Sequence, residues 1–425
     1  MLDIRRIREK PDEMRKGLKS RGEDTGVVDE ILSIDARKRA LLTETESLKS
    51  ERNSASKEIG ALKKRGEDTA AAQKSVRSLG GKISALDAEI RELSSTLETR
   101  LMNVPNVPHE TVPAGPDESG NRVVREHGER REFDFEPLKH VELGSGLGIM
   151  DLERGAKIAG SGFPLLMERG ALLERALIQY MLDIHVKEHG YTEIWPPVMC
   201  SSASMTGTGQ LPRLADDMYK VESDDLYMAP TAEVPVTNFF AGEIIERPLP
   251  VYFTAYTCCF RREAGAAGKQ TRGLIRVHQF DKVEMVKFVE PETSYEELET
   301  LLADAEDIIR RLKLPYRVLQ LCTGDMSFAS AKCYDIELWA PGQNEWLEVS
   351  SCSNFEDFQA RRAGIKYRDE SGKPRFVHTL NGSGVALARL VVAILENYQQ
   401  ADGTVVIPDV LVPYMDGLGK LVKRT

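Results

Sequence analysis

The sequence of 425 residues lacks several features that mark whole classes of protein. No apolar run approaches the roughly 18 residues that a membrane-spanning helix needs. The N-terminal stretch MLDIRRIREKPDEMRKG is charged throughout and has no apolar segment like that of a signal peptide. The six cysteines form no CxxC pair and no spacing typical of a metal site, so no zinc is expected. These absences predict a cytoplasmic protein with reduced thiols, and they argue against a disulfide-rich secreted protein or a membrane protein.

An excess of positive charge is also missing. Lys and Arg number 57 against 67 Asp and Glu, which gives a formal net charge of −10. A nucleic-acid partner would therefore have to be met by a local basic patch and not by the molecule as a whole. Hydrophobic residues make up 41% of the chain and charged residues 29%, which is ordinary for a globular protein of two or three domains.

The first hundred residues carry the 3.5-residue hydrophobic period of a coiled coil. One series of positions spaced by three and four begins at Ile31 and ends at Leu62, and a second runs from Ala72 to Leu97. The short polar segment KKRGEDT lies between them and could reverse the chain. We therefore expect a long antiparallel helical hairpin over about residues 28–100.

Basic residues gather in the distal half of this expected hairpin. Residues 49–82 contain nine basic and four acidic residues, a local net charge of +5. A solvated coiled-coil surface is one interpretation, and a contact with a phosphate backbone is the other. The candidates for such a contact are Lys57, Lys63, Lys64, Arg65, Lys74 and Arg77.

A segment rich in proline and glycine separates the hairpin from the rest of the chain. Residues 102–121 hold four prolines and two glycines, which neither a helix nor a central strand tolerates. We divide the chain into an N-terminal domain (1–101), a linker (102–136) and a larger domain (137–425). In the larger domain, strand-like segments at 251–263, 274–289, 333–340 and 345–353 show no βαβ rhythm. They predict an α+β fold in which helices flank an antiparallel sheet.

The segment 254–289 is the most informative stretch for function. It predicts a strand, a Gly-rich loop at 264–273 and a second strand. Alternation in the second strand places cations, an aromatic ring and a carboxylate on one face: Arg276, His278, Phe280, Lys282 and Glu284. Such a face suits a nucleoside triphosphate, because Arg binds phosphate and Phe stacks on a base. A solvated sheet face with scattered charges is the alternative.

Three further segments carry polar residues that could serve the same site. In the hairpin expected at 334–353, Glu348 and Ser351 are hard-oxygen candidates for Mg²⁺ held together with phosphates. In HTLNGSGVALARL, Gly382 and Gly384 are expected to open a helix whose N-terminus and Arg389 face anionic phosphate. The segment 231–233 (Thr-Ala-Glu) lies between two prolines and is expected to form a rigid loop.

Together these features resemble the seryl-tRNA synthetase family of class II aminoacyl-tRNA synthetases, over nearly the whole chain. The helical arm, the VPNVPHETVP linker and three motifs carry the resemblance. The motifs are the helix 170–189 leading into YTEIWPP, then CFRREAG…TRGLIRVHQFDKVE, and finally LNGSGVALAR. The Thr-Ala-Glu loop and the EVSS segment at 348–351 favour serine over other class II substrates.

The resemblance implies roles for individual residues. Arg261, Arg389 and Glu348 would be catalytic. The serine site would contain Thr231, Ala232, Glu233, Glu284, Asn381 and Ser383, with Glu284 binding the ammonium group. The ATP site would contain Arg261, Arg262, Glu263, Arg276, Val277, Phe280, Glu348, Val349, Ser350, Ser351 and Arg389. Mg²⁺ would be supported by Glu348 and Ser351.

The activity that this resemblance implies is ATP-dependent activation of serine as seryl-adenylate, followed by transfer to tRNA(Ser). Whether tRNA(Sec) is a second substrate stays open. The resemblance also implies a homodimer without a membrane partner. Two other hypotheses stand beside this one: a catalytically silent synthetase-like protein that binds RNA or protein, and a ligase that loads a carrier protein.

Overall fold

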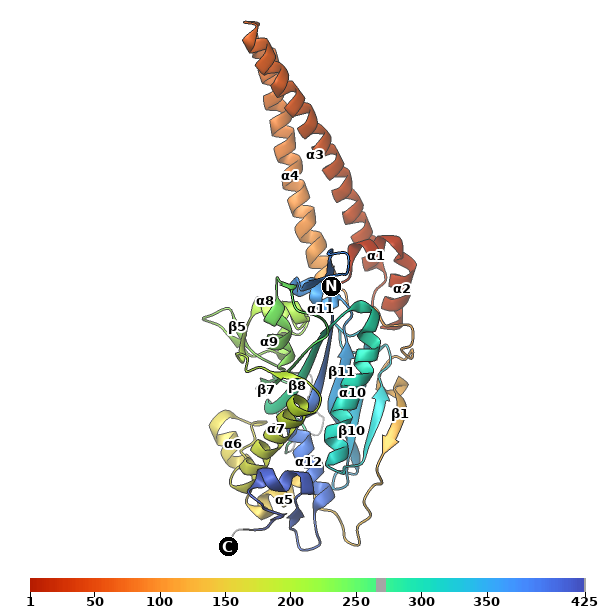
Figure 1. Cartoon of the computed structure of the whole chain (residues 1–425), viewed down its shortest axis with the longest axis vertical. Helices are drawn as coiled ribbons and strands as arrows, with labels where there is room; N and C mark the ends of the chain where they lie inside the picture. The colour runs from red at the N-terminus through yellow and green to blue at the C-terminus, as the bar shows by residue number, and fades with distance from the viewer. Residues whose placement is uncertain (265–272, 424–425) are drawn as a thin grey trace. The chain divides into compact units, whose positions relative to one another are not determined.

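The computed structural model describes residues 1–264 and 273–423, which form two compact units. One unit spans Leu2–Pro105, and the other spans Asn106–Thr425 together with Met1. Figure 1 shows long helices in the first unit and a sheet with helices around it in the second. In the described part of the chain, no helix is both long enough and apolar enough to cross a membrane.

The smaller unit is a helical hairpin, as predicted. Two short helices, α1 (Ile4–Glu9) and α2 (Pro11–Ser20), precede the long helices α3 (Gly26–Lys64) and α4 (Ala70–Met102). The 39 residues of α3 correspond to a length of about 58 Å. The turn between α3 and α4 lies in the polar segment KKRGEDT, where Gly66 adopts a positive φ of 71°.

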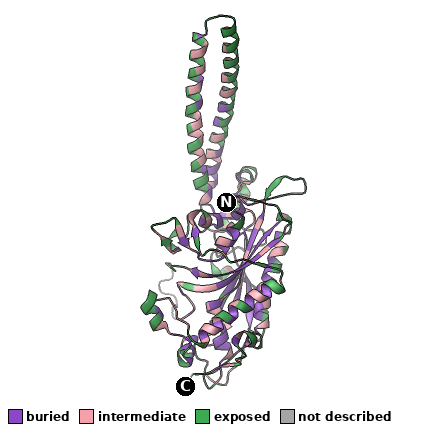
Figure 2. Ribbon diagram, turned by 60° about the vertical axis from the view of Figure 1, so that its left-hand side comes forward, coloured by how far each residue is buried: buried purple, intermediate pink, exposed green. Residues whose placement is uncertain are grey.

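The hydrophobic period determines which side of each arm helix is buried. Ile31 and Leu41 of α3 and Leu79, Ile83 and Leu97 of α4 are buried, and the other predicted seam positions are buried or half-buried. Figure 2 shows exposed residues along the remaining sides. Ion pairs between the helices border this seam, from Arg37 to Glu89 (2.9 Å) and from Lys49 to Asp87 (3.1 Å). The two helices therefore pack by the seam that the sequence predicts.

An eight-stranded sheet forms the centre of the larger unit. Its strand order is β1-β9-β10-β11-β14-β8-β7-β2, and every neighbouring pair is antiparallel except β2 and β7. The strands are β1 (Arg122–His127), β9 (Tyr316–Gln320), β10 (Lys332–Ala340), β11 (Glu345–Asn354), β14 (His378–Ala386), β8 (Gln279–Val289), β7 (Val251–Phe260) and β2 (Thr192–Glu193). This confirms the predicted α+β class with an antiparallel sheet.

Helices cover one face of this sheet and bury its apolar side chains. Val283 and Met285 of β8 and Leu347 of β11 belong to one hydrophobic core with α7 (Arg169–Lys187), α10 (Ser294–Arg311) and α12 (Leu387–Tyr398). The remaining helices are α5 (His140–Leu147), α6 (Leu152–Ala159), α8 (Ser202–Thr208), α9 (Glu233–Thr237) and α11 (Phe358–Ala363). Because side chains alternate along a strand, the residues between the core positions face the other side of the sheet.

Three small sheets complete the larger unit. They consist of β3 (Met199–Ser201), β5 (Leu226–Met228) and β4 (Lys220–Val221), of β13 (Pro374–Phe376), β12 (Lys366–Arg368) and β6 (Ile244–Ile245), and of β15 (Val405–Val406) with β16 (Lys420–Leu421). The short 3-10 helices are η1 (Glu118–Gly120), η2 (Ala215–Asp217), η3 (Asn238–Phe240), η4 (Pro291–Thr293) and η5 (Asp409–Met415).

Several local predictions need correction. Part of the range 102–136 is folded, because β1 pairs with β9 at the edge of the large sheet. The strand expected at 274–289 begins at Gln279, so Arg276 and Val277 precede it. The segment 231–233 is not entirely loop, since α9 begins at Glu233.

The expectation that Gly382 and Gly384 open a helix is wrong. Both lie in β14, and α12 begins at Leu387. Close packing explains these glycines better than a turn does. A Cβ on Gly382 would lie 2.9 Å from Sγ of Cys352, and a Cβ on Gly384 would lie 2.5 Å from Nε2 of His185. Arg389 still lies in the first turn of α12.

Candidate active site

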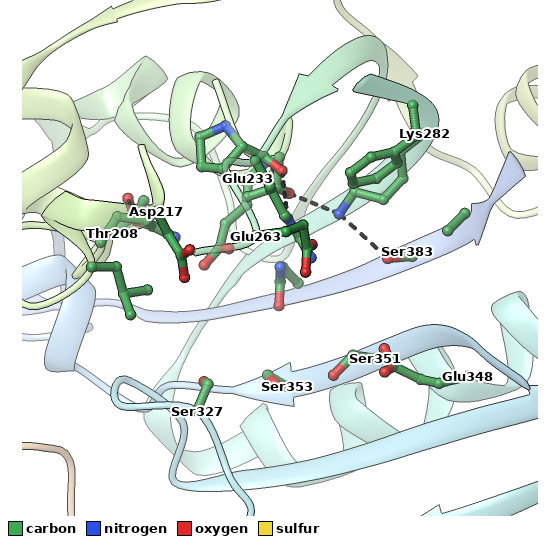
Figure 3. A pocket seen from close by; sticks show the side chains of 18 of the residues that line it. Thr208, Asp217, Glu233, Glu263, Lys282, Ser327, Glu348, Ser351, Ser353 and Ser383 are labelled. Atoms are coloured by element: carbon green, nitrogen blue, oxygen red, sulfur yellow. Dashed lines mark hydrogen bonds between the residues drawn. The ribbon is translucent and has the colours of Figure 1, made fainter. Parts of the chain in front are cut away.

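The face of the sheet opposite α7, α10 and α12 borders a cavity of about 540 Å³ (Figure 3). The alternation of the strands explains its position. Lys282 and Glu348 line the cavity, whereas their neighbours Val283 and Leu347 belong to the core beneath the sheet. A volume of this size lies within the range of roughly 300–1,000 Å³ that small-molecule sites occupy.

Most residues expected at the site line this one cavity, although they come from distant parts of the chain. The expected residues that line it are Thr231, Glu233, Arg261, Glu263, Arg276, Val277, Phe280, Glu348, Val349, Ser351, Asn381, Ser383 and Arg389. In Figure 3, Glu348 and Ser351 lie on one strand, across the cavity from Glu233 and Lys282. The structure thus brings the expected serine and nucleotide residues into a single space.

Four expected residues do not line the cavity. Ala232 is fully buried in a separate hydrophobic cluster with Phe253 and Phe288. The guanidinium of Arg262 donates to the main-chain oxygen of Asp216 (3.1 Å).

The other two lie beneath the cavity surface. Ser350 donates its hydroxyl to the main-chain oxygen of Ser383 (2.6 Å). Glu284 is 0% exposed; its Oε1 accepts from Nδ2 of Asn381 (2.8 Å), and its Oε2 forms an ion pair with Lys282. Both therefore support residues that line the cavity.

Arg261 follows β7 and is the cavity arginine best placed for an anionic ligand. Its Nε donates to the main-chain oxygen of Pro230 (3.2 Å), and its guanidinium lies 5.2 Å from the centre of the Phe280 ring. Among the described residues, no carboxylate lies within ion-pair distance of this guanidinium. Its positive charge is therefore available to a ligand beside an aromatic ring.

The other two cavity arginines are held by protein groups. Nη1 of Arg276 contacts Oε2 of Glu263 (2.7 Å), which adopts a positive φ of 50° just after β7. Arg389 donates to the main-chain oxygens of Ile275 (3.0 Å) and Glu348 (2.7 Å), and its Nη1 lies 3.5 Å from Oε2 of Glu348. These contacts orient both guanidinium groups at the cavity wall.

Glu233 is an acidic group held in an unfavourable place for charge. Burial raises its pKa to about 7, and repulsion by Glu284 adds to the shift, while Gln359, Lys282 and Arg261 oppose it. Its Oε1 accepts from Nε2 of Gln359 (2.6 Å). This carboxyl is therefore poised to exchange a proton near neutral pH, and a cationic ligand would stabilise its ionised form.

Sequence reasoning gave no role to Lys282, which lines the cavity between the two buried glutamates. Its Nζ donates to Oγ1 of Thr231 (2.8 Å) and Oγ of Ser383 (3.4 Å), besides its ion pair with Glu284. The alternation of β8 already placed Lys282 on the functional face. Its significance was missed because lysines on strands are usually solvated.

Four further cavity residues were also missed. Thr208 at the end of α8 and Asp217 in η2 lie between β3 and β4, Ser327 precedes β10, and Ser353 lies in β11; all four line the cavity. The Oδ1 atom of Asp217 accepts from the main-chain N–H of Ala264 (2.9 Å). No motif marks these positions, because only the folded chain brings these segments together.

Glu348 and Ser351 offer oxygen ligands that would fit Mg²⁺ held mainly by phosphates. They lie on β11 at the cavity, and the side chain of Glu348 is 47% exposed there. Within residues 1–264 and 273–423, no group of three or more His, Cys, Asp or Glu side chains could hold a metal ion. The Gly-rich loop expected at 264–273 lies largely outside the described residues.

The basic residues singled out on the arm are all exposed. This holds for Lys57, Lys63, Lys64, Arg65, Lys74 and Arg77, of which Arg65 forms an ion pair with Glu67 (3.1 Å). Charges exposed in this way are free to meet phosphates.

Comparisons with known proteins match both units. Residues 1–108 match the family model of the seryl-tRNA synthetase N-terminal domain, and residues 219–398 match the tRNA synthetase class II core domain (G, H, P, S and T). The chain is 56% identical over 426 residues to the serine–tRNA ligase of Thermomicrobium roseum, which covers 100% of this chain and 95% of that protein. It is 53% identical over 423 residues to the serine–tRNA ligase of Listeria monocytogenes serotype 4a, with 99% of each chain covered.

A solved structure resembles the whole chain. The seryl-tRNA synthetase of Pyrococcus horikoshii, crystallised with ATP, is 40% identical and superposes with a TM-score of 0.95, with 100% of both chains covered.

Proposed function

The chain belongs to the seryl-tRNA synthetase family and is a class II serine–tRNA ligase, and we propose that it forms seryl-adenylate in the cavity bordered by β8, β11 and β14. The observation that carries this proposal is the guanidinium of Arg261, which has no carboxylate partner among the described residues and lies beside Phe280 in the same cavity as the buried carboxyl of Glu233. An anion, an aromatic base and an amine would thus find complementary groups within one space. The described residues of the site retain the arginines and carboxylates that catalysis would need, which argues against a catalytically silent protein.

Formation of the adenylate needs alignment more than proton transfer. The carboxylate of serine is already ionised at pH 7, so it attacks the α-phosphorus of ATP without a general base. The bond from the α-phosphorus to the bridging oxygen of the β-phosphate breaks, and pyrophosphate leaves. A terminal hydroxyl of the tRNA then attacks the carbonyl of the adenylate, and AMP leaves.

In this proposal the arginines neutralise the phosphates. Arg261 would contact the α-phosphate and the carboxylate of serine, while Arg276 and Arg389 would hold the outer phosphates. Phe280 would stack on adenine, and Glu263 and Val277 would line the nucleotide side. Glu348 and Ser351 would hold Mg²⁺ together with the phosphates, and the bound ion would supply positive charge there.

We assign the ammonium group of serine to Glu233, which departs from the expectation that Glu284 binds it. Glu284 does not line the cavity; its Oε1 accepts from Asn381, and its Oε2, which has no hydrogen-bond partner among the described residues, forms an ion pair with Lys282. Glu233 lines the cavity, and burial, which raises its pKa to about 7, disfavours its ionised form until a cation such as an ammonium group pairs with it. Thr231, Asn381 and Ser383 would surround the side chain of serine.

The remaining assignments concern domains and partners. We propose that residues 1–101 bind tRNA(Ser) through Lys57, Lys63, Lys64, Arg65, Lys74 and Arg77, and that residues 137–425 carry the catalysis. We also propose a homodimer in which Trp195, 78% exposed next to Tyr256, is covered by the second copy. A cytoplasmic location follows from the need for ATP and tRNA. A second candidate substrate is tRNA(Sec).

Pyrophosphate exchange into ATP, measured with each of the twenty amino acids, tests the proposal directly. We expect exchange with serine and at most weak exchange with the others, followed by charging of tRNA(Ser) with serine. Addition of a chelator should stop exchange, and Mg²⁺ should restore it. Absence of exchange with serine would contradict the proposal.

A further inference from the structure

Lys282 lies at the centre of the amino-acid end of the cavity, although the proposed reaction gives it no task. The residue is 5% exposed and lines the cavity from β8. Its Nζ donates to Thr231 (2.8 Å) and to Ser383 (3.4 Å; Figure 3). It also forms an ion pair with Glu284. A buried ammonium group on three protein partners has little freedom to move.

The contacts of Lys282 decide how the hydroxyl of Thr231 can bond. A hydroxyl group has one proton to donate and two lone pairs that accept. Oγ1 of Thr231 accepts from Nζ of Lys282 (2.8 Å) and from the main-chain N–H of Glu233 (3.2 Å), so both lone pairs are occupied. Its proton therefore remains for another acceptor, and among the described residues none lies within hydrogen-bond distance of it.

Ser383 contacts the same ammonium group. Its Oγ accepts from Lys282, because an ammonium group donates only. Lys282 therefore helps to leave Thr231 with only its proton to offer, whereas Ser383 keeps its proton and one lone pair. A side chain bound between them must offer an acceptor.

We propose that Lys282 is a specificity-determining residue for the amino acid, because it fixes Thr231 as a donor that demands an oxygen on the substrate side chain, while Ser383 beside it can also donate to that oxygen. The inference rests on the proposed placement of serine in this cavity. Alanine has no such oxygen and leaves the buried donors unpaired, which is the arrangement that rejects an analogue lacking a hydroxyl. Threonine carries the oxygen, so Lys282 does not discriminate against threonine.

The test compares Lys282→Met with a matched control, Lys287→Met, in ATP–pyrophosphate exchange with serine, alanine and threonine. Lys287 lies on the same strand, is 1% exposed and pairs with Glu297, but it does not line the cavity. We expect Lys282→Met to lower the preference for serine over alanine, as a ratio of kcat/KM, at least about tenfold. The preference for serine over threonine and the KM for ATP should change less than about twofold.

The control separates recognition from folding. Lys287→Met also removes one buried positive charge, so the melting temperature of this variant should fall. Its preference for serine over alanine should stay that of the unmodified protein. An unchanged preference in Lys282→Met, or an equal loss in Lys287→Met, would overturn the inference.

A double variant tests whether Lys282 acts through Thr231. Thr231→Val removes the donor and should reproduce the loss of preference. The combination with Lys282→Met should then lose no more than about twofold beyond either single variant, because both remove the same interaction. Full multiplication of the two losses would contradict the inference.

If Lys282→Met does not fold, because Glu284 is left buried without its partner, Lys282→Met with Glu284→Gln removes both charges. This variant should show the same loss of preference for serine over alanine, and a retained preference would overturn the inference. Failure of the unmodified protein to exchange with serine is a distinct result, and it would refute the proposed function itself.

Discussion

The arm and the cavity hold their charges in different ways. On the arm, ion pairs such as Arg37–Glu89 join side chains that are 59% and 41% exposed. At the cavity wall, the side chain of Lys282 is 6% exposed and pairs with Glu284 beneath the surface, which is 0% exposed. Water and salt screen the first kind of pair, so each contributes about 0–1 kcal/mol. A buried pair cannot lose one member without leaving an uncompensated charge.

This difference indicates how the two regions would perform their tasks. The arm would act by the sum of exposed charges, so its single residues are replaceable and its effect depends on salt. The cavity would act through individual groups at fixed places, each with its own partners. Four predictions test this contrast, from the largest expected effect to the smallest.

The largest effect is expected from Arg261→Ala. Loss of the guanidinium at the α-phosphate should lower serine-dependent pyrophosphate exchange by about 10³-fold. Arg262→Ala is the comparison, since Arg262 contacts Asp216 outside the cavity. The loss of exchange in Arg262→Ala should be at least tenfold smaller than in Arg261→Ala. Binding of tRNA, measured by filter retention, should persist in Arg261→Ala. Similar exchange in both variants would remove the special role of Arg261.

Reversal of charge at the tip of the arm should have the next largest effect. We expect Lys63, Lys64 and Arg65, all changed to Glu, to lower tRNA charging about 100-fold and to flatten its salt dependence. Pyrophosphate exchange should stay the same, because the cavity belongs to the other unit.

The matched control for the arm reverses three exposed basic residues elsewhere in the same unit, Lys16, Lys19 and Arg91. The change in net charge is identical. If aminoacylation of tRNA falls equally in both triple variants, the basic residues at the tip have no particular role, and the net charge of the unit determines tRNA binding.

Acidity should affect the cavity through Glu233. Because its pKa is raised to about 7, the carboxyl is mostly protonated below that pH and cannot pair with the ammonium of serine. We expect kcat/KM for serine to rise about tenfold between pH 6 and pH 8, as the ionised fraction of a group with this pKa does. Glu233→Gln should abolish this rise and should increase the KM for serine.

Stability gives an independent check on Glu233. A carboxyl whose pKa is raised on folding binds more protons in the folded state, so the free energy of unfolding falls as pH rises from about 4.5 to about 7. Urea unfolding should show a smaller fall in Glu233→Gln. An identical pH dependence in the two proteins would contradict the raised pKa.

The smallest effects should come from the arm seam. Thr45 is 2% exposed, and its hydroxyl has no hydrogen-bond partner among the described residues. Thr45→Val should therefore stabilise the hairpin by about 1 kcal/mol in thermal unfolding followed by circular dichroism. Exchange of pyrophosphate should not change. A destabilised variant would show that this hydroxyl has a partner in solution.

Repetition explains how much of the arm the sequence could predict. The seam residues between Ile31 and Leu97 belong to two helices that are neighbours in the sequence and are joined by one short turn. The hydrophobic period and the polar KKRGEDT segment are therefore enough to predict that these two helices pack on each other. The α+β class followed in the same way from alternation within strands. The edge strand β1 was not foreseen, because its pairing with β9 joins segments almost 200 residues apart.

The sequence by itself therefore determined the types of element and the kinds of group at the site, since periodicity and residue chemistry are local properties. Only the tertiary structure decided which groups meet. The register of β8 against β14 places Lys282 beside Ser383 and Glu284 beside Asn381, and the packing of α9 brings Glu233 and Thr231 to the same point. Hydrogen bonds and ion pairs act over a few ångströms, so roles such as that of Lys282 depend on contacts that no linear pattern contains.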